Sequence, residues 1–94
     1  MPQLPPIELL EATHTFPCPY TFKVIGEKAD DFEGRVRAAV ATALKPGTPA
    51  TFTTRETDGG RHISVTVVAL AHKSEDVHAV YHALHELKGL FLLF

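Results

Sequence analysis

The stretch from Gly60 to Ala71 constrains the fold of this chain more than any other, because it is the longest run rich in β-branched residues. Every second residue in it belongs to a wholly apolar set, made up of Ile63, Val65, Val67, Ala69 and Ala71. Side chains alternate between the two faces of a strand, so this set predicts a strand with one face on a hydrophobic core. The intervening set is of mixed polarity and could face water, a ligand or a partner; it comprises His62, Ser64, Thr66, Val68 and Leu70.

Length and composition limit what can surround this strand. The chain has 94 residues, enough for one domain with one core. Hydrophobic residues make up 45% and charged residues 21%, which indicates a globular domain. The net charge of −2 gives no basic excess for binding nucleic acid, and no apolar run approaches the ~20 residues that span a membrane.

The cysteine count and the first residues bear on the compartment. One cysteine, Cys18, rules out an intramolecular disulfide. Residues 1–6 contain neither a basic residue nor a long apolar segment, so they do not read as a signal peptide. Both observations favour a cytoplasmic location.

Five further segments have patterns of regular structure. Residues 19–26 read as a strand, and the Thr-rich residues 49–57 suit a strand at the edge of a sheet. Apolar stripes of period 3.6 predict helices over residues 30–44 and 74–88. A short apolar run predicts a last strand over residues 90–94.

Local signals mark where these elements begin and turn. Asp30 and Ser74 are the expected N-caps of the two helices, because their side chains can accept hydrogen bonds from the first free backbone N–H groups. Asp58-Gly59-Gly60 predicts a hairpin turn, since such turns need residues that tolerate positive φ. The same turn could cradle an anion with Arg61, but it lacks the helix that follows a phosphate-binding loop.

The order βαββαβ predicts an α+β fold, the ferredoxin-like sandwich, with a four-stranded antiparallel sheet and two helices on one face. A right-handed crossover places strand 60–71 beside strand 19–26 at the centre of the sheet. The last strand then flanks strand 19–26, and the Thr-rich strand takes the far edge. Residues 1–15 are expected to form an N-terminal arm with a short helix, and residues 16–94 the ferredoxin-like domain.

The segment from Phe16 to Gly26 reads Phe-Pro-Cys-Pro-Tyr-Thr-Phe-Lys-Val-Ile-Gly. It resembles the opening Phe-Pro-x-Pro-aromatic-x-aromatic-Lys-Val-x-Gly of the YbeD-like domain-of-unknown-function family of small bacterial proteins. The resemblance extends over residues 8–94, through the start of the central strand and an apolar last strand. It implies an ACT-like regulatory module with no defined catalytic or ligand-binding residues. The N-terminal arm and the histidine-rich second helix depart from the family pattern.

Three histidines share one flank of the second helix: His78, His82 and His85 lie at i, i+4 and i+7, and Glu75 lies one turn before them. Such a flank can hold Zn²⁺, Ni²⁺ or Cu²⁺, with a second subunit completing the site. The competing interpretation is a solvated flank that binds metal only adventitiously. We favour the latter, because no established metal signature is present.

Catalytic arrangements are not evident in the sequence. No nucleophile–base set and no paired general acid and base can be identified, and no base or cation adjacent in the sequence marks Cys18 as a reactive thiol. The acidic residues 30, 31 and 33 are explained by helix capping. RNA binding and acylphosphatase-like activity are both disfavoured, because the central strand lacks exposed aromatics and residues 26–31 contain no arginine. We therefore expect no enzyme and no cofactor.

The remaining signal is an apolar surface, with Val68 and Leu70 on the open face of the sheet and Leu90 and Leu92 on the last strand. Apolar sheet faces and edges that stay uncovered are sites for partners. We expect a non-enzymatic ACT-like regulatory or binding module that acts through self-association, a partner protein or a small metabolite. No nucleic acid or membrane partner is expected, and metal binding by the histidine flank is the alternative function.

Overall fold

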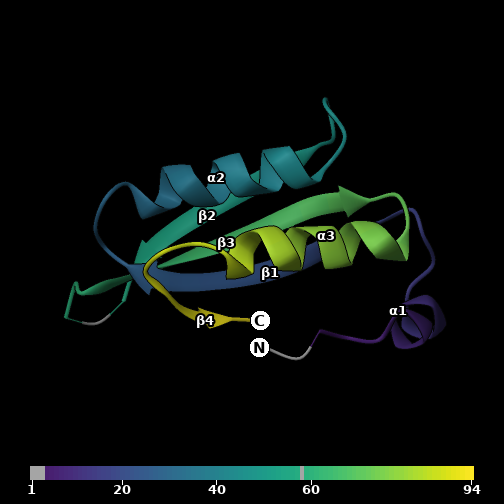
Figure 1. Ribbon diagram of the computed structural model, residues 1–94, viewed down its shortest axis with the longest axis horizontal. Helices are drawn as coiled ribbons and strands as arrows, with labels where there is room; N and C mark the ends of the chain where they lie inside the picture. Colours follow the sequence, from purple (N-terminus) through teal and green to yellow (C-terminus); the bar gives the residue numbers. More distant parts are fainter. Residues whose placement is uncertain (1–3, 58) are drawn as a thin grey trace.

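The computed structural model describes residues 4–57 and 59–94 and contains one antiparallel sheet with helices on one of its faces (Figure 1). The elements are α1 (Ile7–Thr13), β1 (Cys18–Glu27), α2 (Phe32–Ala43), β2 (Ala50–Glu56), β3 (His62–Ala71), α3 (Ser74–His85) and β4 (Leu90–Leu93). The strand order β2-β3-β1-β4 is the predicted one, and the α+β ferredoxin-like fold is confirmed. None of the helices within these residues is long and apolar enough to cross a bilayer.

Strand β3 lies at the centre of the sheet, as its sequence predicts. It pairs with β1 from Ala71 opposite Cys18 to His62 opposite Glu27, and with β2 on its other side. Its apolar set is buried throughout, so that face forms the floor of the core. Figure 1 shows α2 and α3 lying over this face, and their apolar stripes bury Val36, Val40, Val77, Val80 and Leu84.

Helix α2 is capped by Asp31 instead of the predicted Asp30. Both residues have positive φ, and the Asp31 carboxylate accepts a hydrogen bond from the Gly34 N–H at 3.2 Å. This contact also explains the glycine, since a Cβ at position 34 would lie 2.1 Å from an Asp31 carboxylate oxygen. The left-handed backbone of two consecutive residues delays the helix by one position, which propensities do not reveal.

Helix α3 begins at Ser74, but the predicted cap is wrong. The Ser74 hydroxyl is buried and donates to the Glu11 carboxylate of α1 at 2.9 Å. Asp76 instead reaches back, and its carboxylate accepts from the N–H groups of His72 and Lys73 at 2.9 and 3.3 Å. The helix ends at His85 and not at residue 88, so Gly89, with φ of 87°, serves the turn into β4.

The N-terminal segment packs against the N-terminal end of α3 (Figure 1). Leu10 on α1 is 2% exposed and belongs to the same hydrophobic cluster as the sheet and the long helices. Besides the Glu11–Ser74 hydrogen bond, the Pro5 carbonyl lies 2.5 Å from Nε2 of His78. Helix α1 is therefore held by its own chain, through one buried side chain and two polar contacts.

Strand β4 carries a β-bulge in its pairing with β1. Leu92 lies opposite Ile25, whereas Leu90 lies opposite Gly26, and the register shifts between those two β1 residues. Leu90 and Leu93 pack against the core, and Phe91 points away from it and is exposed. The alternation assumed from the sequence, with Leu90 and Leu92 on one side, is wrong because a bulge inserts an extra residue.

The hairpin between β2 and β3 agrees with its turn signal. Gly59 and Gly60 have φ of 87° and 70°, values that glycine adopts readily. The Thr57 N–H donates to the His62 carbonyl at 2.9 Å and closes the turn. Asp58, the third residue of the predicted turn, lies outside the described residues.

Candidate functional site

The most exposed apolar surface lies along β4 and the residue after it. We call this surface the β4 apolar edge; its members are Phe91, Leu92 and Phe94, which are 61%, 42% and 60% exposed. The Phe91 ring stacks at 4.8 Å on His62 of the open sheet face. Strand β4 pairs only with β1, so its other side is a free sheet edge among the described strands. Exposed apolar side chains on a free edge mark a surface suited to pairing with another chain.

The predicted interface residues do not form one patch. Val68 and Leu70 lie on the open face, half-buried, opposite Thr21 and Pro19 of β1. Leu92 lies opposite Ile25, and along β1 it is separated from Val68 by about 13 Å and from Leu70 by about 20 Å. Leu90 packs against the core. The structure thus separates the predicted surface into an apolar area at Val68 and Leu70 and the β4 apolar edge.

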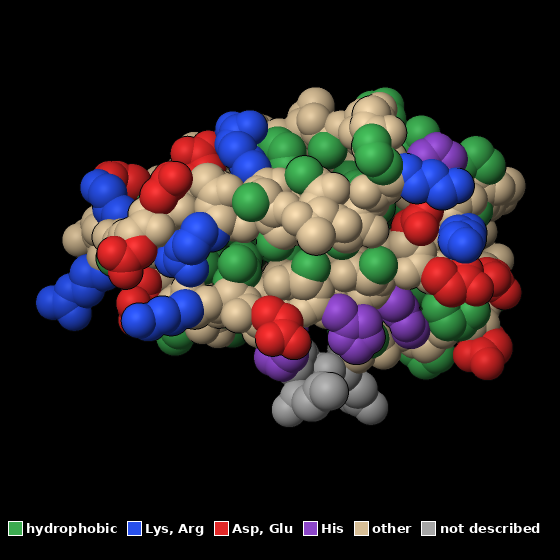
Figure 2. All heavy atoms as spheres, turned by 45° about the horizontal axis from the view of Figure 1, so that its top comes forward, with side chains coloured by type: hydrophobic (Ala, Val, Ile, Leu, Met, Phe, Trp, Pro, Cys, Tyr) green, Lys and Arg blue, Asp and Glu red, His purple; other side chains and the backbone are tan. Residues whose placement is uncertain are grey.

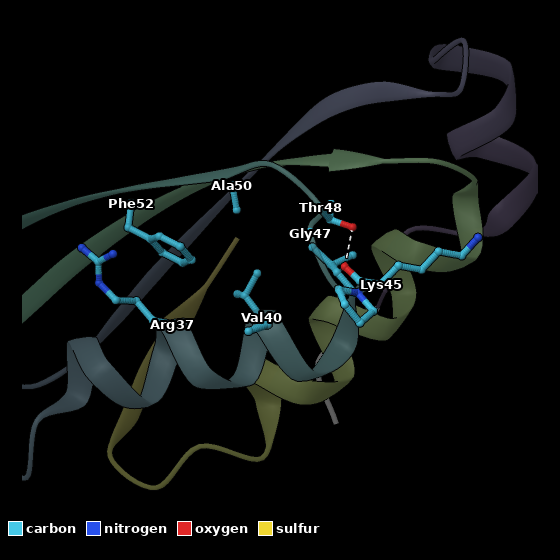
Figure 3. Close-up of a pocket in the computed structure, with 10 residues that line it drawn as sticks. Arg37, Val40, Lys45, Gly47, Thr48, Ala50 and Phe52 are labelled. Carbon is cyan, nitrogen blue, oxygen red and sulfur yellow. Dashed lines mark hydrogen bonds between the residues drawn. The ribbon is translucent and has the colours of Figure 1, made fainter.

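A pocket of about 240 Å³ opens between α2 and β2, near the edge of the sheet (Figure 3). Val40 and Phe52 form its apolar walls, and Arg37 lies over the Phe52 ring at 4.7 Å. Lys45 lies at the other end, where the Thr48 hydroxyl donates to the Lys45 carbonyl at 2.7 Å. The pocket is smaller than most ligand sites, so it suits at most a small apolar group.

Three hydrogen-bonded side chains, Thr54, Glu33 and Arg37, lie beside this pocket. Thr54 donates a hydrogen bond to Glu33 at 2.7 Å, and the Arg37 guanidinium binds the same carboxylate oxygen at 3.1 Å. The Thr54 hydrogen bond, followed by that of Arg37, lowers the pKa of Glu33. Glu33 partly neutralises Arg37, and the Lys45 side chain extends away from the pocket (Figure 3).

The histidine flank of α3 is present, but its members are not equivalent. The rings of His78 and His82 lie 6.4 Å apart, and His78 contacts the Pro5 carbonyl. His82, His85 and Glu75 are exposed. On the face drawn in Figure 2, histidine side chains gather along the lower edge of the molecule.

These positions do not complete a metal site by themselves. Within residues 4–57 and 59–94, no group of three or more His, Cys, Asp or Glu side chains is arranged to hold a metal ion. An ion at His78 and His82 would also displace the contact with Pro5. Ligands from a second subunit would be required, and the site at His78, His82, His85 and Glu75 stays a prediction.

The remaining reactive side chains have structural surroundings. Cys18 is a half-buried free thiol at the start of β1. Tyr81 of α3 packs on Phe22 and Tyr20, with ring centroids 5.0 and 6.3 Å away, and its pKa is raised by burial and by hydrogen bonding to Tyr20. A phenol held in its neutral form among aromatic rings is a packing element that joins α3 to the sheet.

Sequence reasoning overlooked two cations on the open face, Lys23 of β1 and Arg55 of β2. Alternation along residues 19–26 places Lys23 on that face. Arg55 could not be placed, because the register of β2 on β3 is not evident in the Thr-rich sequence. The structure sets Arg55 opposite Ser64, which fixes it on the same face as Lys23.

Comparison with known proteins agrees with the fold and with the family resemblance. The structure is similar to the crystal structure of the ACT domain from GTP pyrophosphokinase of Chlorobium tepidum, with a TM-score of 0.66 and 12% identity over 81% of this chain and 94% of that chain. It is also similar to the solution structure of protein HP0495 from H. pylori, with a TM-score of 0.67 and 14% identity over 99% and 98% of the two chains.

Sequence comparison identifies the family. A UPF0250 protein of Shewanella piezotolerans is 35% identical over 83 residues, which is 88% of each chain. Residues 11–93 match the family described as protein of unknown function, DUF493. Both findings confirm the YbeD-like resemblance. This chain therefore belongs to the DUF493 family.

Proposed function

We propose that this protein is a non-enzymatic ACT-like binding or regulatory module that acts by associating with a second copy of itself through the β4 apolar edge. The observation that carries the proposal is the exposure of Phe91, Leu92 and Phe94 on a free strand edge. Water contact with three large apolar side chains is unfavourable, and their burial in a dimer stabilises it by about 25 cal/mol for each Å² covered.

A second copy is the occupant that best fits this edge. Two identical strands that pair antiparallel about a two-fold axis present the same residues to each other, so one apolar strip suffices for both sides. The backbone of Phe94 is already fixed on β1 by hydrogen bonds to Lys23 at 2.9 and 3.1 Å. The edge is therefore ordered before association, which reduces the entropy that binding must overcome.

Analytical ultracentrifugation of untagged protein over a wide concentration range tests this proposal. We expect a monomer–dimer equilibrium that Phe91→Glu and Leu92→Glu shift fully to monomer while leaving the circular dichroism spectrum unchanged. Leu9→Glu is the matched control, because Leu9 is an apolar residue of α1 that is 53% exposed and lies on another element. A wild-type protein that stays monomeric at the highest concentration overturns the proposal.

The variants Val68→Glu and Leu70→Glu test whether the partner covers the open face of the sheet or only the β4 apolar edge. If the partner lies across the open face, these variants also weaken the dimer. If it pairs along β4 alone, they leave the dimer intact. Both results are compatible with self-association, and they decide which of the two apolar areas is covered.

Metal binding by the histidine flank is the alternative function. The observation that favours it is the spacing of His78 and His82, whose rings lie one helical turn apart in an edge-to-face arrangement, with centroids 6.4 Å apart. Calorimetry of untagged protein with Zn²⁺ should then show tight binding that His78→Ala with His82→Ala removes. Weak binding that the double variant leaves unchanged excludes this function.

A further inference from the structure

The open face of the sheet carries a cluster of cationic and hydroxyl side chains that neither function above uses. Lys23 on β1 lies opposite Thr66 on β3, and Thr66 lies opposite Thr53 on β2. One step along β3, Ser64 lies opposite Arg55. Residues directly opposite each other in antiparallel strands share a face, so all five side chains project from the side that the helices leave free.

These residues line a hollow of about 210 Å³, which we call the oxyanion hollow. Strand β3 runs between the two cations, and their partners Thr66 and Ser64 are two residues apart on it, so the Cα atoms of Lys23 and Arg55 are about 12 Å apart. Both side chains are long enough to converge above the hydroxyl groups of Ser64 and Thr66. The result is a polar floor from the central strand with one cation on each side.

The cations and hydroxyls of the hollow are not engaged by the rest of the described chain. Neither Lys23 nor Arg55 forms an ion pair within residues 4–57 and 59–94. The hydroxyl of Thr57, at the rim, differs because it donates to the His62 carbonyl. Glu56, the carboxylate at the rim, is paired with Lys28. Although the whole chain has a net charge of −2, this face therefore presents two cations with no carboxylate bound to them in the described chain.

We infer that the oxyanion hollow binds the phosphate group of a small phosphorylated molecule. An Arg guanidinium binds two oxygens of such a group at once, and Lys adds a second charge. Two cations match a dianion better than the single charge of a carboxylate, and the hydroxyls of Thr53, Ser64 and Thr66 can donate to the remaining oxygens. The size of the hollow suits one oxyanion group with a small body attached.

The apolar surroundings indicate where the rest of the ligand would lie. Ile25 lines the hollow and lies opposite Leu92 on β4. A ligand anchored between Lys23 and Arg55 would thus extend its carbon skeleton over Ile25, toward the β4 apolar edge. The phosphate group itself would bind beside the proposed dimer contact and would not depend on it.

Amide-resolved NMR titration with inorganic phosphate tests this inference, with sodium chloride holding the ionic strength constant. We expect saturable shifts at residues 23, 53–55 and 64–66. Arg55→Gln and Lys23→Gln should each weaken binding at least about tenfold, since each removes a charged hydrogen-bond donor. Thr66→Val should weaken it less, because it removes one neutral donor from a strand position that valine suits.

Lys45→Gln is the matched control, since it makes the same charge change at the α2–β2 pocket. Binding that this variant weakens as much as Arg55→Gln, or shifts that never saturate, overturns the inference. Equally tight binding of acetate also overturns it, because a single charge would then suffice. Glycerol phosphate should bind at least as tightly as inorganic phosphate if the ligand is a soluble monoester, whereas preference for an oligonucleotide over both would overturn that assignment.

The neutral variant Leu92→Gln separates this inference from self-association, because it removes the apolar side chain from the edge without placing a negative charge opposite Ile25. We expect the monomeric variant to retain saturable phosphate binding, because Lys23 and Arg55 belong to one chain. Loss of binding in this variant, with Lys23 and Arg55 intact, contradicts a hollow that is complete within one subunit. Absence of a wild-type dimer would overturn the proposed function and leave the phosphate result unaffected.

Discussion

At Gly26, strand β1 passes directly beneath the ring of Phe32 at the start of α2. A Cβ built at this position would lie 2.2–2.6 Å from three ring carbons, and both residues are buried. Gly26→Ala forces the ring or the strand to move, so we expect it to lower the free energy of unfolding by about 1–3 kcal/mol. Urea denaturation monitored by circular dichroism measures this loss.

A second substitution tests whether the ring is the cause. Phe32→Leu alone leaves a void and destabilises the domain, but it also makes room for the added methyl group. The double variant Gly26→Ala with Phe32→Leu should therefore lose less stability than the sum of the two single variants. Strict additivity would show that Gly26 is needed for a reason other than the Phe32 contact.

The raised pKa of Tyr81 predicts how the free energy of unfolding changes at alkaline pH. Burial raises the pKa of its phenol above the ordinary value, so the folded protein keeps this proton after the unfolded chain has released it. Stability from Tyr81 is then fully present below pH ~10 and declines as pH rises further, at up to about 1.4 kcal/mol per pH unit. Urea denaturation from pH 9 to 12 should show a shallower decline in Tyr81→Phe. A Tyr81→Phe profile parallel to that of wild type contradicts this account.

At the scale of elements, the seven-residue helix α1 depends on contacts outside itself to stay folded. A helix of this length is marginal alone, so its order must come from docking on α3. Leu10 is buried and Leu9 is 53% exposed, although they are neighbours with the same side chain. Leu10→Ala should lower the free energy of unfolding by about 2–4 kcal/mol, whereas Leu9→Ala should change it by less than about 0.5 kcal/mol.

Hydrogen exchange shows which element responds to these two changes. The N–H of His14, which donates to the Leu10 carbonyl at 2.9 Å, reports on α1. Its exchange should become much faster in Leu10→Ala, while amides in the centre of β3 remain protected. If β3 and α1 lose protection together, the arm is a cooperative part of the core and not a separately opening element.

At the scale of the whole molecule, the sequence predicts the features that depend on one chain segment at a time. The alternation along residues 60–71 and the stripes of the two long helices follow from hydrophobic periodicity, and the order of the strands follows from the handedness of the crossover connections. The positive-φ glycines of the β2–β3 turn follow from the local backbone preference. The family resemblance rests on the same local patterns, and it too is confirmed.

Features that depend on contacts between distant segments escape such reasoning. Serine is a residue type that often caps helices, but the Ser74 hydroxyl donates its hydrogen bond to Glu11 of α1 instead. The bulge in β4 arises from pairing with β1 and turns Leu90 toward the core. Likewise, the oxyanion hollow exists only because the register of β2 on β3 brings Arg55 to the face of Lys23. The candidate sites were therefore less predictable than the fold, because each combines side chains from several strands.

Self-association, if it occurs at the β4 apolar edge, also links stability to concentration. Binding between folded chains withdraws them from the unfolding equilibrium, so the melting temperature rises with protein concentration. For a domain of 94 residues that unfolds from a dimer, we expect roughly 3–5 °C for each tenfold rise. Leu92→Glu should melt at one temperature across the same range, while Leu9→Glu should keep the wild-type slope. The melting temperature of a monomer does not depend on protein concentration, whatever its stability. A wild-type melting temperature that stays constant across this concentration range in scanning calorimetry would therefore contradict the dimer, even if the variants melt at lower temperatures.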